Sequence, residues 1–178
     1  MRIVAGTARG RPLAAPPGQG TRPTSDKIRG AVFNILGQFF DGGAVLDLYA
    51  GTGAMALEAL SRGCARAVCV ERDRRVAEVL RRNAEACGFA GRVEVRVEPV
   101  EAALARLPPA TFALVFVDPP YADGPGAALD GVAPLLAPGA RVVAEHDARR
   151  PPAERHGPLV RIDRRTYGTT GISIYQPG

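Results

Sequence analysis

From residue 44 onward, short apolar segments alternate with amphipathic ones, and this alternation limits the possible folds more than any other feature of the sequence. Apolar segments of strand length occupy residues 44–49, 67–71, 93–97, 112–117 and 140–145. Segments with helical periodicity or helix-starting residues lie between them. Repeated strand-and-helix units build sheets with helices on both faces. We therefore predict an α/β fold with a doubly wound, mostly parallel sheet.

The two ends of the chain depart from this alternation. Residues 158–167 and 171–175 predict two strands joined by a short turn, which form a hairpin at the edge of the sheet. Residues 1–14 predict a small N-terminal hairpin. We expect residues 1–178 to form a single domain, with a basic hairpin arm at 1–24 and the body that carries the sheet at 25–178.

The net charge of +5 is concentrated at the N-terminus. Residues 1–40 hold six basic groups and one acid, whereas residues 41–178 hold 17 of each. This asymmetry favours an anionic partner such as a nucleic acid, and a solvated surface without a partner explains it equally well. All but one of the 23 basic residues are arginines, which fits either a GC-rich genome or a thermophile. The basic residues of the first forty are Arg2, Arg9, Arg11, Arg22, Lys27 and Arg29.

The cysteine and histidine content argues against a metal or disulfide framework. Cys64, Cys69 and Cys87 form no C-x-x-C pair and lie in apolar stretches, so we expect them to be small buried residues. The two histidines are far from them in the sequence, and no metal site is expected. The sequence contains no signal peptide and no long apolar run, which favours the reducing cytoplasm.

A glycine-containing loop follows the first predicted strand. It reads Asp-Leu-Tyr-Ala-Gly-Thr-Gly-Ala over residues 47–54. Glycines at Gly51 and Gly53 let the backbone approach a ligand closely and leave the N–H groups of the next helix facing it. Glu71 ends the second strand, at the position where an acid binds a ribose diol in doubly wound folds. Together these features predict a nucleoside-containing cofactor.

The same loop also fits the dinucleotide pattern G-x-G-x-x-G/A, because Ala56 follows Gly51 and Gly53 at the right spacing. Asp47 argues against this alternative. It lies at the end of the first strand, where it would repel a pyrophosphate but attract a cationic amino-acid group.

The sequence Asp118-Pro119-Pro120-Tyr121 directly follows the fourth strand. Because the carboxyl ends of parallel strands carry the site in open α/β sheets, this segment is expected to face the same crevice as the glycine loop. The prolines fix the backbone, so the carboxylate of Asp118 and the carbonyl of Pro119 can both accept hydrogen bonds from an amino group. Tyr121 can stack on a planar base. The motif therefore predicts an exocyclic amine as the reacting group.

These segments together resemble a known family. The loop at 47–53, Glu71 and the segment 118–121 look like motifs I, II and IV of the class I amino-methyltransferases. Residues 21–29 (Thr-Arg-Pro-Thr-Ser-Asp-Lys-Ile-Arg), with Val-Phe-Asn-Ile-Leu at 32–36 and the basic opening before them, are similar to the bacterial 16S ribosomal RNA guanine-N2 methyltransferases that modify guanine-966. The resemblance covers essentially the whole chain. Motif IV alone is shared with adenine-N6 enzymes.

The resemblance implies a seven-stranded Rossmann-like sheet, S-adenosyl-L-methionine as cofactor with S-adenosyl-L-homocysteine as product, and 16S ribosomal RNA or the assembling small subunit as substrate. Where the family often has Asn or Asp followed by Ala near the adenine, this chain has Glu98 and Pro99. Glu98 can still accept a hydrogen bond, but Pro99 removes a backbone donor. The implied cofactor residues are Asp47, Tyr49, Gly51, Thr52, Gly53, Glu71, Arg72, Glu98 and Asp118.

The expected chemistry needs no metal and no covalent nucleophile, because a sulfonium already carries a good leaving group. Positioning and electrostatics then supply the catalysis, and the base must be exposed or flipped to reach the crevice. We expect a cytoplasmic monomer without membrane contacts. The expected catalytic residues are Asp118, Pro119, Pro120 and Tyr121, and the expected RNA-binding residues are Arg2, Arg9, Arg11, Arg22, Thr24, Lys27 and Tyr121.

Three other functions are compatible with parts of the pattern. The nearest is an adenine-N6 methyltransferase acting on DNA or RNA. A nicotinamide-dependent oxidoreductase would use the glycine loop but is disfavoured by Asp47 and by the Asp-Pro-Pro-Tyr segment. A nonenzymatic nucleic-acid-binding module would use the basic N-terminus but has no need of a cofactor crevice.

Overall fold

The structure is a computed structural model that describes residues 1–18 and 24–178. Within these residues one sheet of eight strands runs in the order β3-β2-β1-β4-β5-β8-β7-β6. Five strands pair in parallel: β1 (Ala44–Leu48), β2 (Arg66–Val70), β3 (Val93–Arg96), β4 (Phe112–Val117) and β5 (Leu136–Asp147). Three pair antiparallel beyond β5: β6 (Arg155–His156), β7 (Leu159–Tyr167) and β8 (Thr170–Pro177). The predicted α/β fold is confirmed.

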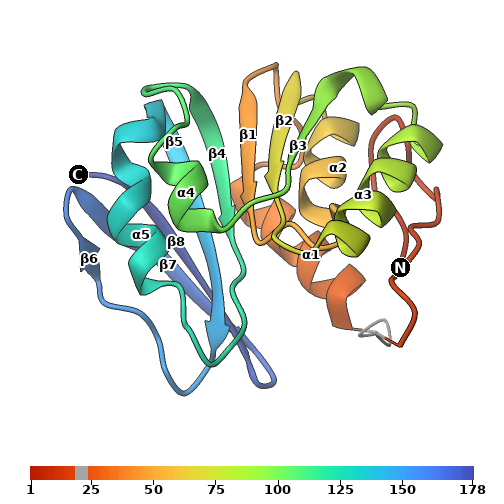
Figure 1. Cartoon of the computed structure of the whole chain (residues 1–178). Coiled ribbons are helices and arrows are strands. Elements are labelled where there is room, and N and C mark those ends of the chain that lie inside the picture. The colour runs from red at the N-terminus through yellow and green to blue at the C-terminus, as the bar shows by residue number, and fades with distance from the viewer. Residues whose placement is uncertain (19–23) are drawn as a thin grey trace.

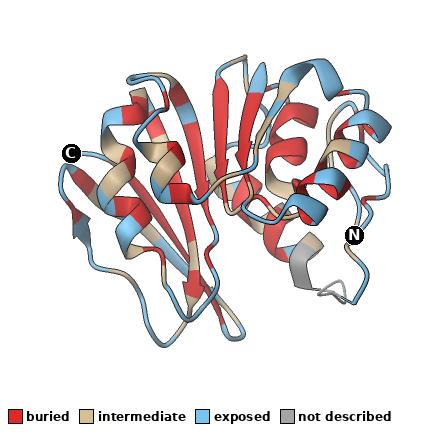
Figure 2. Ribbon diagram, in the orientation of Figure 1, coloured by how far each residue is buried: buried red, intermediate tan, exposed pale blue. Residues whose placement is uncertain are grey.

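Helices cover both faces of the sheet (Figure 1). The first face packs against α1 (Thr24–Leu36), α2 (Ala54–Ser61) and α3 (Arg74–Ala86), and the second against α4 (Val100–Leu104) and α5 (Gly126–Val132). Short 3-10 turns occupy Ala90–Arg92 and Ala133–Leu135. Figure 2 shows the buried positions along the strands and on the inner sides of the helices. None of the helices in the described ranges has the length and apolar character needed to cross a membrane.

Each face of the central strands has its own apolar core. Val45, Phe116 and Val143 belong to the core beneath α1, α2 and α3. Their immediate neighbours, such as Leu46 and Val115, belong to the core beneath α4 and α5. This alternation follows from the two-residue period of a strand, and it explains why parallel strands buried on both faces are apolar throughout. The three cysteines are free and buried, as predicted.

One sequence prediction about strands needs correction. The sheet has eight strands rather than seven, because the two-residue strand β6 pairs with β7 through Arg155↔Val160 and His156↔Leu159. Two residues are too few to show a strand period in the sequence. The small N-terminal hairpin forms as one antiparallel bridge, Arg2↔Pro12, with backbone hydrogen bonds from Ile3 N to Arg11 O (3.0 Å) and from Leu13 N to Met1 O (2.9 Å). The edge hairpin formed by β7 and β8 is confirmed.

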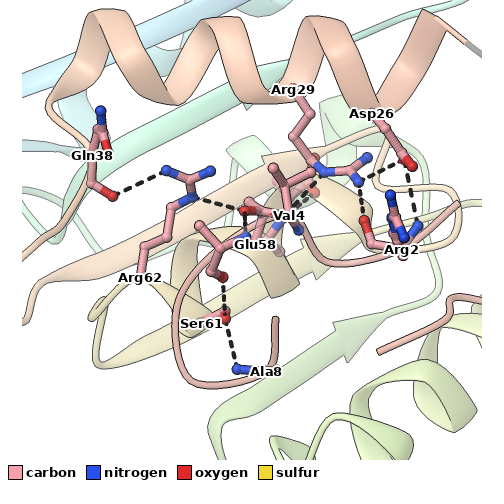
Figure 3. Close-up of polar contacts among 12 residues, drawn as sticks. Arg2, Val4, Ala8, Asp26, Arg29, Gln38, Glu58, Ser61 and Arg62 are labelled. Atoms are coloured by element: carbon pink, nitrogen blue, oxygen red, sulfur yellow. Dashed lines mark hydrogen bonds and ion pairs between the residues drawn. The ribbon is translucent and has the colours of Figure 1, made fainter. Parts of the chain in front are cut away.

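The N-terminal arm, residues 1–14, is held by a buried carboxylate on α2. Both oxygens of Glu58 accept backbone hydrogen bonds from the arm, from the N–H groups of Val4 (2.8 Å) and Ala5 (3.0 Å). The same oxygens pair with Arg29 Nε at 3.2 Å and with Arg62 Nε at 2.7 Å. Figure 3 shows this arrangement between α1 and α2. All three charged side chains are almost completely buried, so the pairing is needed to keep them there.

A second polar residue ties the arm to the loop that follows β1. Asn83, buried on α3, accepts a hydrogen bond from Ala14 N (2.8 Å) and donates to Ala14 O (3.0 Å). Its amide also donates to Thr52 O at 3.0 Å. Asn83 therefore fixes the end of the arm against the glycine loop.

The strand order places a crevice beside β1. The chain passes from β1 outward through β2 and β3 and then returns to add β4 on the other side of β1. At such a reversal the loops after neighbouring strands diverge and leave room for a ligand at the carboxyl ends. The glycine loop follows β1, Glu71 follows β2 and Asp118 follows β4.

Candidate active site

A cavity of about 890 Å³ opens where β1, β2, β4 and β5 end. Its volume lies in the range of pockets that enclose cofactor-sized molecules. The structure brings most of the predicted cofactor and catalytic residues together in its wall. They are Asp47, Tyr49, Gly51, Thr52, Glu71, Arg72, Glu98, Asp118, Pro119, Pro120 and Tyr121.

The two glycines of the loop after β1 differ in what they contact. Gly51 has a φ of 55°, and a side chain there would meet no atom within 4 Å, so its backbone is open to the cavity. Gly53 has a φ of 82°, and an added Cβ would lie 2.9 Å from Cγ of Leu80. The sequence predicts a ligand contact for both glycines. The structure brings only Gly51 to the cavity wall, and Gly53 instead lets α2 begin close to α3.

Tyr49 adopts a strained backbone conformation at the start of this loop. Its φ of 62° lies in the left-handed region, which residues with a side chain rarely occupy. Such strain persists where the surrounding structure fixes it, and it concentrates at functional sites. Burial raises the pKa of the Tyr49 hydroxyl, which keeps its proton available for donation to a ligand.

Glu71 is oriented by backbone donors on both of its oxygens. Oε2 accepts a hydrogen bond from Gly51 N at 3.0 Å, and Oε1 accepts one from Asp73 N at 2.8 Å. A carboxylate has about four acceptor positions, so each oxygen keeps one for a ligand. The side chain is half-buried in the cavity wall. This geometry fits two adjacent ribose hydroxyls, as the sequence predicts.

Asp47 is a buried carboxyl group that faces the cavity. Its Oδ2 accepts a hydrogen bond from Ala56 N at 3.2 Å. The pKa of Asp47 is raised from 3.8 to about 8, mainly by burial; the Ala56 N–H lowers it, and the nearby carboxylates of Asp118 and Glu71 add to the rise. A group in this state gains most from a positively charged ligand, because a cation compensates the charge that burial disfavours.

Glu98 reaches the cavity wall but is engaged by arginines. One oxygen pairs with Arg106, and the other lies 3.8 Å from Arg96 Nη1. The sequence predicts Glu98 as an acceptor for an adenine amino group. In the structure its carboxylate lies in the wall and is already shared with two cations, while Pro99 beside it is the N-cap residue of α4.

The Asp-Pro-Pro-Tyr segment leaves β4 and enters the cavity wall. Asp118 is exposed there, and Pro119 behind it is buried. The hydroxyl of Tyr121 lies 3.2 Å from the hydroxyl of Thr170 on β8. The sequence predicts a role only for the ring of Tyr121, which can stack on a base. The structure shows that its hydroxyl also anchors the ring to a neighbouring strand.

Four of the basic residues predicted to bind RNA lie outside the cavity. Arg2, Arg9, Arg11 and Lys27 are exposed and do not contribute to its wall. Arg22 lies outside the described residues, as does the side chain of Thr24. The arm therefore presents its guanidinium groups to solvent while its backbone is held by Glu58 and Asn83.

Several residues of the wall were missed by sequence reasoning. Arg29 and Glu145 carry charges, and Val32, Thr170 and Met1 complete the wall from α1, β8 and the arm. The sequence could have indicated Glu145 as a site residue, because it lies near the end of the predicted fifth strand. Arg29 had none, since its burial depends on Glu58, which is distant in the sequence.

The polar side chains of the wall are mainly carboxylates and hydroxyls. It suits a ligand that combines a cationic group, a sugar diol and an amine that donates hydrogen bonds. Across the described part of the chain, His, Cys, Asp and Glu side chains form no group of three or more that could hold a metal ion.

The chain is similar to known proteins along its length. The family model described as conserved hypothetical protein 95 matches residues 1–176. "Putative rRNA methyltransferase YlbH" of Bacillus subtilis is 37% identical over 181 residues, which cover 99% of this chain and 98% of that protein. "Ribosomal RNA small subunit methyltransferase D" of Escherichia coli is 40% identical over 124 residues, which cover 70% of this chain and 62% of that protein.

Solved structures give the same result. "Putative methyltransferase yhhF" from Escherichia coli has a TM-score of 0.82 at 31% identity, with 99% of this chain and 97% of that one covered. The Thermus thermophilus hypothetical protein TTHA0928 has a TM-score of 0.78 at 31% identity, with 98% of each chain covered. The family match over residues 1–176 and the full-length similarity to YlbH show that this chain belongs to the conserved hypothetical protein 95 family, which includes ribosomal RNA small subunit methyltransferase D.

Proposed function

We propose that this chain is an S-adenosylmethionine-dependent methyltransferase that modifies the exocyclic N2 amine of a guanine in 16S ribosomal RNA. The names of its relatives support a ribosomal RNA methyltransferase, and the cavity supports the cofactor and the amine. The observation that carries the proposal is that Asp47, Glu71 and Asp118 share one cavity at the ends of three neighbouring strands.

The residues of the cavity fit S-adenosylmethionine. Glu71 offers acceptors for the ribose hydroxyls, and Asp47 offers a buried negative charge for the cationic amino-acid end. Gly51 leaves room for close backbone contact. Tyr49, Thr52 and Arg72 complete this part of the wall. When bound, the cofactor supplies an electrophilic methyl group on a sulfonium.

The chain's own residues then position the amine. Asp118 accepts one N–H of the amino group and the carbonyl of Pro119 accepts the other, which turns the nitrogen lone pair toward the methyl carbon. Asp118 would take the proton that the amine releases when the methyl group leaves the sulfonium sulfur and bonds to the nitrogen. Tyr121, anchored by Thr170, stacks on the base and fixes its plane. Preorganised groups of this kind are a large part of catalysis in sites without a nucleophile.

The arm is proposed to bind the phosphates of the RNA. Its arginines are exposed and its backbone is already fixed, so binding of an anionic strand costs little further backbone entropy. The base must then be turned out of its stack to reach Asp118. We place the reaction in the cytoplasm, where small subunits assemble.

Transfer of labelled methyl groups tests this function. The substrates are 16S ribosomal RNA and small subunits from a strain that lacks this gene, and the product is digested to nucleosides. We expect label in N2-methylguanosine, and a loss of rate of about 10²–10³ in Asp118→Ala with cofactor binding retained. Label in N6-methyladenosine would instead establish the adenine-N6 alternative, and no transfer to either substrate would refute the proposal.

A further inference from the structure

A second carboxylate lines the cavity from the strand that neighbours β4, and the proposed methyl transfer gives it no role. Glu145, near the end of β5, lines the main cavity and also an adjoining cavity of about 150 Å³. Tyr121 and Pro119 line both cavities as well. His146 and Arg150 also line the smaller cavity. Glu145 therefore lines the part of the wall where the space for the base extends past the reacting amine.

The register of the sheet sets Glu145 beside Asp118. β4 and β5 pair in parallel with Phe116↔Val143 and Val117↔Ala144, so the next positions are Asp118 and Glu145. Neighbouring strands lie about 4.8 Å apart. Phe116 and Val143 both face the core beneath α1, and side chains alternate along a strand. The same alternation puts Glu145, within β5, on this face, and Asp118 directly follows the paired end of β4; both line the cavity at this edge.

The opposite side of Glu145 is fixed by β8. Glu145 pairs with Ile172, and the next pairs along are His146↔Gly171 and Asp147↔Thr170. Thr170 is the residue that anchors the Tyr121 hydroxyl. One pair of strands therefore fixes both the stacking ring and the second carboxylate, so their relative positions are set by a hydrogen-bonded ladder rather than by a loop.

Guanine and adenine differ at N1, the ring atom beside the reacting amine. On its Watson–Crick edge, guanine carries the N2 amine and, beside it, an N1–H donor. Adenine carries the N6 amine beside an N1 lone pair, which is an acceptor. A carboxylate adjacent to Asp118 accepts a hydrogen bond from an N1–H and repels an N1 lone pair. An adenine-specific site needs a donor at this place instead.

We propose that Glu145 is a specificity-determining residue, which accepts a hydrogen bond from N1–H of the flipped guanine while Asp118 accepts from its N2 amine. This inference depends on the proposed function, because it assigns the second acceptor of the same base. Each of two neighbouring carboxylates accepts a hydrogen bond from one of two neighbouring donors on the base. The pair selects guanine over adenine, a choice that the Asp-Pro-Pro-Tyr segment alone does not make.

The test uses RNA in which 2-aminopurine replaces the methylated guanine. This base keeps the 2-amine but has an unprotonated N1. The RNA is made by ligation and offered both as free 16S ribosomal RNA and in reconstituted small subunits. We expect the wild type to prefer guanine over 2-aminopurine by about 10²-fold or more in kcat/KM. In Glu145→Gln, whose amide can donate to the bare N1, this preference should shrink by about ten- to hundred-fold.

Two further variants complete the design. Asp123→Asn removes an exposed carboxylate that lines the same two cavities, and it should leave the preference unchanged. Glu145→Ala should lower the rate on guanine and leave the rate on 2-aminopurine within a few-fold. Both Glu145 variants should bind S-adenosylmethionine with wild-type affinity, which separates base selection from cofactor binding.

The outcomes distinguish this inference from the proposed function. If the wild type methylates guanine but Glu145→Gln and Glu145→Ala keep its preference over 2-aminopurine, Glu145 does not read N1 and the inference is wrong. If the wild type methylates adenine, or neither base, the proposed function fails and the inference fails with it. A smaller preference in Glu145→Gln, without a change in Asp123→Asn, supports both.

Discussion

Asp47 is buried and also lines the cavity, and this gives the stability of the free protein a specific pH dependence. Its pKa is about 8 when folded against an ordinary value of 3.8, so the folded state holds a proton that the unfolded chain has released. The resulting stability is fully present below about pH 4 and is lost as pH rises toward and through 8. We expect Asp47→Asn to remove this loss, which thermal melts of the free protein between pH 5 and 9 will measure.

The same proton links pH to cofactor binding. A cation beside Asp47 favours its ionised form, so binding of S-adenosylmethionine below about pH 8 should release a proton. Affinity should therefore rise with pH until about 8 and then level off. Calorimetric titrations in buffers of different ionisation enthalpy measure the proton directly. An unchanged proton count in Asp47→Asn would show that the released proton comes from another group.

Tyr121 should depend on Thr170 for its function. Tyr121→Phe keeps the ring and removes the hydroxyl, and Thr170→Val removes the partner at similar volume. A neutral hydrogen bond contributes about 0.5–1.5 kcal/mol, so each variant should raise KM for RNA by a few-fold. The double variant should be no worse than either single one, because both changes remove the same contact. Additive losses, or no loss in Tyr121→Phe, would refute the anchoring role.

The arm and α2 form one structural unit through Glu58. Glu58→Ala would leave Arg29 and Arg62 buried without their shared partner and two arm N–H groups without acceptors. Breaking a buried pair of this kind costs about 3–5 kcal/mol. Glu78→Ala on α3 is the control, since its pair with Arg81 is largely exposed and is worth little. Denaturant melts should show a large loss for the first and almost none for the second.

The arginines of the arm should act on RNA rather than on stability. Changing Arg2, Arg9 and Arg11 together to Ala leaves the backbone contacts of the arm in place. We expect an unchanged melting temperature and cofactor affinity. RNA affinity should fall, and the slope of log K against log salt should flatten by about 0.7 for each lost phosphate contact. Filter binding over a salt series measures this slope, and a slope equal to that of the wild type would make the arm purely structural.

At the scale of elements, the sequence predicts the strands that have a clear apolar pattern. It does not predict contacts between residues that are far apart in the chain. The strands β1, β2 and β4 appear within a residue or so of their predicted ends because each is a continuous apolar segment. Strand β6 has two residues and no period, so the sequence does not predict it. The buried roles of Glu58 and Asn83 could not be predicted, because the arm residues that they hold lie about 50 to 70 residues away in the chain.

At the scale of the whole molecule, the candidate site could be predicted because the fold collects short motifs at one edge. Glu71 and Asp118 are 47 residues apart in the sequence, yet both affect the pKa of Asp47. Parallel pairing alone brings their strand ends together. Glu145 belongs to the same edge but carries no motif, so only the register of β5 against β4 places it beside Asp118.

The charges of the molecule are divided between two surfaces that suit different partners. The cavity wall gathers carboxylates from five segments, which suits a cationic cofactor and an amine. The net positive charge lies in residues 1–40, which suits the RNA backbone. This division predicts that cofactor binding and RNA binding can be impaired separately by substitutions in the two regions.

The most direct test is mass spectrometry of 16S ribosomal RNA from cells that lack this gene. We predict the loss of one N2-methylguanine, its return when the wild-type gene is supplied, and no return with Asp118→Ala. An unchanged set of N2-methylguanines in the deletion strain, or the loss of an N6-methyladenine in their place, would contradict the assignment of this cavity to guanine methylation.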